Sequence, residues 1–134
     1  MTDTRAVAEA LYRAFLDGDK DGMLALMHEE VEVSFLGQAQ LHGKAEASRF
    51  FDFAGGLLHD VHFSLEDIVV DGQGAAGIWR ETATTLTGEP WENHGVDVIH
   101  VRDGYVIALH ENSDVREVYK HFPRYDPQPN GLGD

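Results

Sequence analysis

Apolar residues recur every three to four positions in the first part of the chain and alternate with polar ones in the second. The first spacing is typical of a helix that buries one face, and the second of a strand that buries one side. The expected helices cover 2–16, a short stretch that begins at Asp19 or Asp21, and about 44–57. Thr2 or Thr4 is placed to cap the first helix.

Strands are expected over 31–36, 60–70, 75–86, 91–101 and 105–113. Residues 114–122 predict a terminal helix or an irregular cap. Helices that precede a run of long strands indicate an α+β fold, with three helices on one face of a strongly bent, mostly antiparallel sheet. Such a cone has an open mouth and suits one small ligand. We expect one domain over 1–122, followed by a flexible, Pro- and Gly-rich tail over 123–134.

The charge of the chain narrows the range of partners. Its 134 residues include 24 acidic and 10 basic side chains, a formal net charge of −14. This balance argues against nucleic acid and anionic membranes, which need clustered Lys and Arg. Cysteine is absent, and no apolar run is long enough to cross a bilayer. We therefore expect a soluble, cytoplasmic protein.

The stretch 91–113 predicts a β-hairpin, because Asp-Gly between two strand-like runs is a strong turn signal. A two-residue turn would pair Asp97 with His110, and a three-residue loop would pair it with Leu109. We favour the three-residue loop, because it gathers bulky apolar residues on one face together with Asp97 and Glu111. Carboxylates within an apolar face are paired, protonated or functional.

A turn at Gly88-Glu89 would place Arg80 opposite Asp97 on the neighbouring strand. Arg80, Asp97 and Glu111 would then share one apolar face. A structural ion pair is one interpretation of this group. The other is a cavity that holds a general acid and a general base.

Two features resemble the NTF2-like superfamily. They are the Gly-Asp after the first helix and the run Gly-Val-Asp-Val-Ile-His-Val-Arg-Asp-Gly in the last strand pair. The resemblance covers residues 5–122 and implies an NTF2-like (cystatin-like) cone. This superfamily includes SnoaL-like polyketide cyclases, ketosteroid isomerases and limonene-epoxide hydrolases, as well as domains that only bind ligands.

The resemblance also implies roles for particular residues. Asp97 and Tyr12 match the groups that donate hydrogen bonds to the oxyanion in ketosteroid isomerases, in which the Asp is protonated. Ser34 stands where the isomerases keep their base. Arg80 and Glu111 match part of the epoxide-hydrolase site.

Among these families, the functional residues of the SnoaL-like cyclases are the best preserved in this sequence. Thr82 replaces one epoxide-hydrolase acid, whereas Glu111 and Asp114 both stand where the cyclases carry acids. The sequence therefore predicts an acid–base enzyme of the cyclase, isomerase or dehydratase kind. An epoxide hydrolase and a non-catalytic domain that binds a lipophilic ligand are the alternatives.

The predicted chemistry needs a proton-moving group and donors to an enolate oxygen. Glu111, His94 or His42 would move the proton next to a substrate carbonyl. Tyr12, Asp97 and Arg80 would stabilise the oxygen. The expected substrate-binding residues are Trp79, Trp91, Ser34, Phe51, Leu109, Ile99, His94 and His42.

No cofactor is required for this chemistry, and the spacing of the eight histidines does not support a metal site. The second hairpin face carries small aliphatic residues, His100 and His110. Such a face is apolar for a monomer, so we expect a homodimer through the outer side of the sheet.

Overall fold

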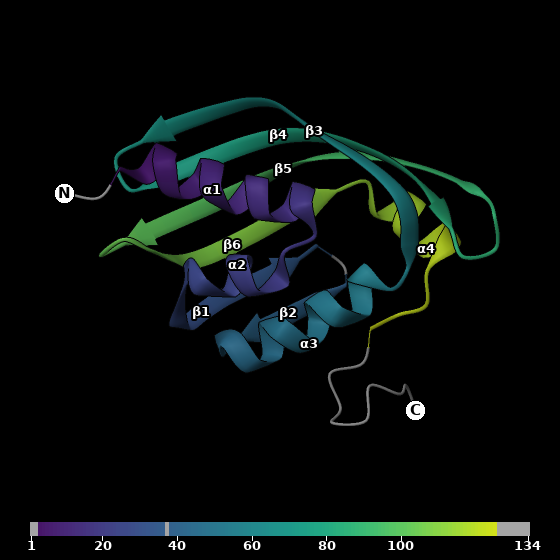
Figure 1. The fold of residues 1–134 in the computed structure, drawn as a ribbon, viewed down its shortest axis with the longest axis horizontal. Helices are drawn as coiled ribbons and strands as arrows, with labels where there is room; N and C mark the ends of the chain where they lie inside the picture. The colour runs from purple at the N-terminus through teal and green to yellow at the C-terminus, as the bar shows by residue number, and fades with distance from the viewer. Residues whose placement is uncertain (1–2, 37, 126–134) are drawn as a thin grey trace.

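A six-stranded sheet bends around the helices in the computed structural model of the chain, which describes residues 3–36 and 38–125 (Figure 1). The elements are α1 (Thr4–Asp17), α2 (Lys20–Ala25), β1 (Met27–Phe35), β2 (Ala39–His42), α3 (Gly43–Gly55), β3 (Leu58–Asp71), β4 (Gly74–Thr85), β5 (Pro90–Arg102), β6 (Tyr105–Ser113) and α4 (Val115–His121). The strand order is β2-β1-β6-β5-β4-β3, and only the β1–β6 pair among these is parallel.

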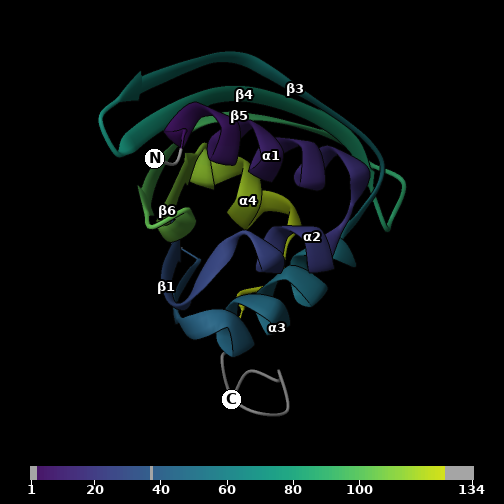
Figure 2. The same cartoon turned by 60° about the vertical axis from the view of Figure 1, so that its left-hand side comes forward.

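The helices lie on the concave side of this sheet. Figure 2 shows β3, β4 and β5 arching over α1, with β1 and β6 down one side and α3 at the open end. The largest fully buried side chains include Leu11, Met27, Phe50, Ile99 and Leu109. The predicted α+β class and its bent, mostly antiparallel sheet are confirmed.

Local hydrogen bonds explain where the first two helices begin and end. Asp3 caps α1, because its Oδ1 accepts from the backbone nitrogens of Arg5 and Ala6 at 3.0 and 3.3 Å. The expected cap by Thr4 is wrong: Thr4 is the buried first residue of the helix, and Thr2 lies outside the described residues. Gly18 ends α1 with a φ of 63°, and Asp19, one of the two predicted starting points, caps α2.

The last hairpin has a register that changes within it. Asp103 and Gly104, with φ angles of 52° and 86°, form a two-residue turn, and Arg102 pairs with Tyr105. The favoured three-residue loop is therefore wrong. The register then shifts between His100 and Val101, so that Asp97 pairs directly with Glu111.

This irregularity changes which side chains of β6 face inward. Val106 is fully buried, whereas Tyr105 is 46% exposed; the three-residue loop would have placed Tyr105 on the inner face and Val106 on the outer one. Asp97 and Glu111 stay on the inner face, because the shift falls on the turn side of both residues.

The register between β4 and β5 also differs from the prediction. Thr84 pairs with Pro90, and a hydrogen bond from the Thr85 nitrogen to the Glu89 oxygen closes a longer loop than the expected two-residue turn. Gly77 therefore lies opposite Asp97, and Arg80 lies opposite His94. A three-residue displacement reverses the face of every side chain, so Arg80 points away from the helices.

The C-terminal end of the described chain packs on α3. The Tyr125 ring lies 5.0 Å from the rings of both Phe50 and Phe53. Ordered contacts thus extend into the predicted tail, and residues 126–134 of that tail lie outside the described residues. No helix of the described chain combines the length and the apolar character that a bilayer crossing requires.

Candidate functional site

A cavity of about 680 Å³ lies between the concave face of the sheet and the helices. Aromatic side chains from α1, α3 and the strands form much of its wall, namely Phe15, Phe35, Phe50, Phe51, Phe63, Trp79 and Trp91. Asp97, Glu111 and Glu81 line the same cavity. It is thus a largely apolar space with carboxyl groups on the sheet side, the composition of a small-molecule site.

Asp97 is 4% exposed and is held by two donors. The Tyr12 hydroxyl donates to Oδ2 at 2.9 Å, and the Trp79 indole nitrogen donates to Oδ1 at 3.1 Å. Burial raises the pKa of Asp97 to about 6, and the two hydrogen bonds oppose that rise. Burial and the nearby Asp97 charge raise the pKa of Tyr12, which keeps this phenol protonated.

Two glycines within the strands make room for these donors. A Cβ at Gly77, the residue opposite Asp97, would collide with the Tyr12 hydroxyl and ring. A Cβ at Gly95 would collide with the backbone oxygen of Asn112 and would lie 2.7 Å from Cζ2 of Trp79. A glycine inside a strand often marks the close approach of another group, and here the two glycines leave space for the phenol and the indole close to the strands.

Glu111 lies directly opposite Asp97 on β6. Burial and the negative charge of Asp97 raise the pKa of Glu111 to about 8, and a hydrogen bond with the Ser113 side chain opposes the rise. Two neighbouring buried carboxyls do not ionise together easily. Near neutral pH the pair therefore favours holding one proton over the loss of both.

Glu81 is a third carboxyl group of the cavity, which the sequence prediction missed. Its Oε1 accepts a hydrogen bond from the Trp91 indole nitrogen at 2.9 Å. Burial raises the pKa of Glu81, and this hydrogen bond lowers it. The predicted register turns Arg80 inward and so turns Glu81 outward. The sequence did contain a signal for Glu81. Residues two apart on a strand share a face, so Glu81 should face the cavity if Trp79 does.

Four of the predicted site residues lie elsewhere. Arg80 is exposed on the outer face, with Nε 3.7 Å from Glu66 Oε1, and His94 lies opposite it. The Ser34 hydroxyl is 2.7 Å from Nδ1 of His110, also outside the cavity. The His42 ring is exposed on the α3 side, next to acidic residues of β1.

The other predicted substrate-binding residues are close to the expected place. Trp79, Trp91, Phe51 and Leu109 line the cavity. Ile99 is fully buried in the core of the sheet, and Tyr12 reaches the site through its bond to Asp97. Within residues 3–36 and 38–125, no three His, Asp or Glu side chains are arranged to hold a metal ion.

Comparisons with known proteins agree with this architecture. The family model for the SnoaL-like domain matches residues 8–110. An NTF2-like protein of unknown function from Burkholderia pseudomallei K96243 is 16% identical with a TM-score of 0.82, over 90% of this chain and 98% of that one. A comparison with curated proteins finds no match.

Two similar structures carry the description of a putative polyketide cyclase. One, from Xanthomonas campestris pv. campestris, is 21% identical with a TM-score of 0.75, over 88% of this chain and 95% of that one. The other, SnoaL-like and from Jannaschia sp. CCS1, is 18% identical with a TM-score of 0.76, over 86% and 90%. At these identities the likeness establishes the fold, and the predicted NTF2-like cone is confirmed.

Proposed function

Because the chain belongs to the SnoaL-like domain family, we propose that it is an enzyme that moves protons within a small lipophilic substrate and needs no cofactor. One observation carries this proposal. Asp97 and Glu111 are paired across β5 and β6, line a cavity of about 680 Å³, and differ in pKa, at about 6 and about 8. Neighbouring carboxyls with separated pKa values are suited to act as base and acid.

In the proposed mechanism, Asp97 is the base. Each of its oxygens accepts one hydrogen bond and keeps a second lone pair. The carboxylate removes a proton from the carbon next to a substrate carbonyl. Glu111 donates its proton to the carbonyl oxygen, so the products of this step are an enol, protonated Asp97 and ionised Glu111.

The enol has two onward routes. Return of the Asp97 proton to a different carbon, with return of the oxygen proton to Glu111, isomerises the substrate. Attack of the enol carbon on a second carbonyl of the same molecule forms a ring, with Glu111 taking the enol proton and Asp97 protonating the new alkoxide. The second route is that of a polyketide cyclase, and the description of two structural neighbours supports it.

The roles differ from those that the resemblance to ketosteroid isomerases implied. A protonated Asp97 as oxyanion donor is disfavoured by its two donors, which stabilise the ionised form. Tyr12 directs its hydroxyl hydrogen at Asp97 and so positions the base. The epoxide-hydrolase alternative needed Arg80 beside the acids, and Arg80 lies on the outer face.

The test is hydrogen exchange of small lipophilic ketones, such as 2-tetralone, in D₂O, followed by proton NMR. The wild-type protein is expected to accelerate exchange of the protons next to the carbonyl. Asp97→Asn removes the base and is expected to cost about 10²-fold or more, the usual scale of general base catalysis. Glu66→Gln, on the outer face, is the control.

Glu111→Gln keeps a hydrogen-bond donor but has no proton to transfer. We expect a smaller loss of rate and the disappearance of the alkaline limb of the pH profile, which reports the ionisation of Glu111. Ketones that bind to the wild-type protein without faster exchange would favour the non-catalytic alternative. An Asp97→Asn variant as active as the wild type would refute the assignment of the base.

A further inference from the structure

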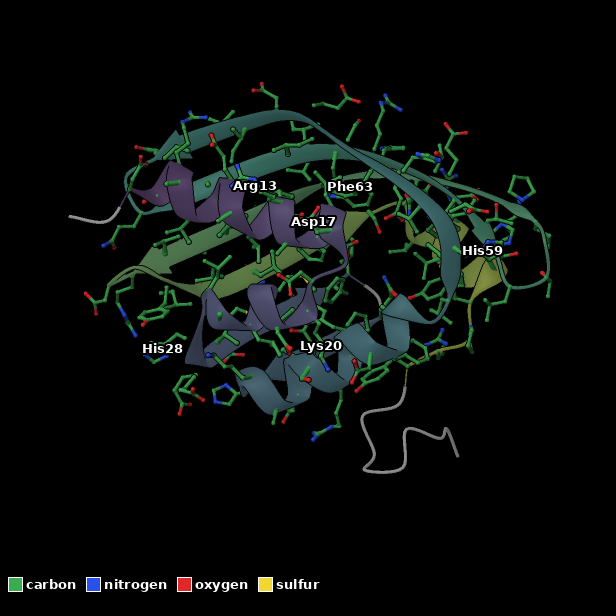
Figure 3. All side chains as sticks on the ribbon, in the orientation of Figure 1. Arg13, Asp17, Lys20, His28, His59 and Phe63 are labelled. Carbon is green, nitrogen blue, oxygen red and sulfur yellow. The ribbon has the colours of Figure 1, made fainter. Side chains whose placement is uncertain are left out.

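The charge balance of the cavity wall is unequal. Four acidic residues line it, Asp52, Glu81, Asp97 and Glu111, against one basic residue, Lys20. Figure 3 shows Lys20 between α2 and α3, and its Nζ lies 2.8 Å from Asp52 Oδ1. The basic residue is thus already paired, and the described wall offers a carboxylate or phosphate ligand no other Lys or Arg.

The three aromatic hydrogen-bond donors at the wall are already paired with carboxylates. The Trp79 indole donates to Asp97, the Trp91 indole donates to Glu81, and the hydroxyl of Tyr12 behind the wall donates to Asp97. Acceptors are in excess, because each carboxylate oxygen accepts more than one hydrogen bond. Such a site favours a ligand that brings donors of its own.

Among the three carboxyl groups on the sheet side of the cavity, Glu81 is the one that the proposed proton transfer does not use. No described residue donates a hydrogen bond to its second oxygen, Oε2. Trp91 lies beside it, and the Phe122 ring is 4.6 Å from the Trp91 ring. A carboxylate in an aromatic wall attracts a cation by charge, and the aromatic rings of that wall add cation–π attraction.

We propose that the substrate carries a protonated amine, which binds against Glu81 and the aromatic wall while the reacting part of the molecule lies between Asp97 and Glu111. This inference rests on the proposed function, and it names the substrate class as a lipophilic amino ketone. Glu81 is then a specificity residue. The overall net charge of −14 also draws cations towards the protein.

Three ligands with one skeleton test the inference without turnover: 1-adamantanemethylamine, 1-adamantanemethanol and 1-adamantanecarboxylate. Trp79 and Trp91 are the two tryptophans of the chain, and both line the cavity, so their fluorescence reports binding. At pH 7 we expect the amine to bind about tenfold more tightly than the alcohol, and the carboxylate to bind most weakly. An alcohol that equals the amine, or a carboxylate that exceeds the alcohol, would overturn the inference.

Two matched variants locate the effect. Glu81→Gln is expected to remove the advantage of the amine and to leave the affinity for the alcohol unchanged. Glu66→Gln removes the same charge from the outer face and should keep the wild-type ranking, which separates a local effect from net charge. A Glu81→Gln protein that still prefers the amine would refute the role of Glu81, and the wild-type ranking stays decisive if this variant unfolds.

The two proposals fail separately. A wild-type protein that prefers the amine but does not accelerate ketone exchange would support the cation site and refute the proposed enzyme activity. A protein that accelerates exchange but prefers the alcohol would support the proposed enzyme activity and refute the cation site.

Discussion

Tyr12 donates its hydroxyl hydrogen to Asp97 across 2.9 Å, which joins the first helix to the fifth strand inside the core. The two residues are 85 positions apart in the sequence. The Tyr12 ring also stacks on Phe63 of β3, with ring centroids 6.1 Å apart, and Figure 3 labels Phe63 near the C-terminal end of α1. The position and charge of the proposed base are therefore coupled to the packing of the helix layer.

Tyr12→Phe should move the acid limb of the activity profile. The Tyr12 hydrogen bond lowers the pKa of Asp97, so its loss raises that pKa from about 6 and reduces the ionised fraction near neutral pH. The ring contacts are kept, and we expect a stability loss of about 1 kcal/mol. Ketone exchange measured between pH 5 and 8 checks this; an unchanged acid limb would show that the bond does not tune the base.

Glu111→Gln should alter how stability depends on pH. Folding raises the pKa of Asp97 to about 6 and that of Glu111 to about 8. The folded protein thus keeps protons that the unfolded chain releases. The stability contributed by these protons is full below about pH 4 and is lost as the pH rises through about 6 and 8.

Thermal unfolding from pH 4 to 9 measures this loss. The Glu111→Gln variant should lose less stability than the wild type on going to high pH, because its amide does not ionise. The raised pKa of exposed His42 acts in the same direction in both proteins and cancels in their difference. A difference between Glu111→Gln and the wild type that does not vary with pH would contradict the raised pKa of Glu111.

Hydrophobic spacing was sufficient to predict the three N-terminal helices, five of the six strands and the α+β class; the short strand β2 was not among the expected strands. Spacing was not sufficient for strand register. Both predicted hairpin registers assumed that one register continues along the whole pair of strands. In the structure the register changes between His100 and Val101, so the pairing near the turn differs from the pairing around Asp97. Alternation alone does not reveal an irregularity inside a strand.

Errors in strand register also explain why only part of the site was predicted. Asp97 and Glu111 come from one hairpin and are correctly placed together, but the loop after Thr85 is longer than the predicted turn. This difference turns Arg80 outward and brings Glu81 into the cavity. Gly77 and Gly95 carry a further signal, since glycine within a strand indicates a close approach.

Arg80→Gln distinguishes the two registers in solution. Arg80 is exposed on the outer face, and its ion pair with Glu66 is a weak surface contact. We expect stability to change by less than about 0.5 kcal/mol and ketone exchange to be unaffected. A loss of exchange activity as large as that of Asp97→Asn would show that Arg80 takes part in the site, as the predicted register implies.

The homodimer remains a prediction, and the outer sheet face is the place to test it. Val96 and Ile78 pair across β4 and β5 on that face, with exposures of 39% and 41%. Sedimentation analysis should give twice the chain mass of 14.9 kDa, and Val96→Lys should reduce it to the monomer. Leu86→Lys, at an exposed residue of the β4–β5 loop, is the matched control. A wild-type monomer would end this prediction.

Gly77→Ala tests whether the sheet must open a space for Tyr12. The added methyl group would occupy the position of the Tyr12 hydroxyl, so either the phenol or strand β4 has to move. Overpacking of this kind costs about 1–3 kcal/mol. The same shift would take the donor away from Asp97 and lower ketone exchange.

Gly74→Ala, in the same strand, is the control for this variant. A Cβ there would lie 3.5 Å from the Asp71 carbonyl oxygen, an ordinary contact. We expect Gly74→Ala to unfold close to the wild-type temperature and to keep its exchange activity. Gly77→Ala should unfold at a lower temperature and exchange ketone protons more slowly. If the two alanine variants behave alike, β4 does not need the space at Gly77, and the bond between Tyr12 and Asp97 is not what orders the proposed base.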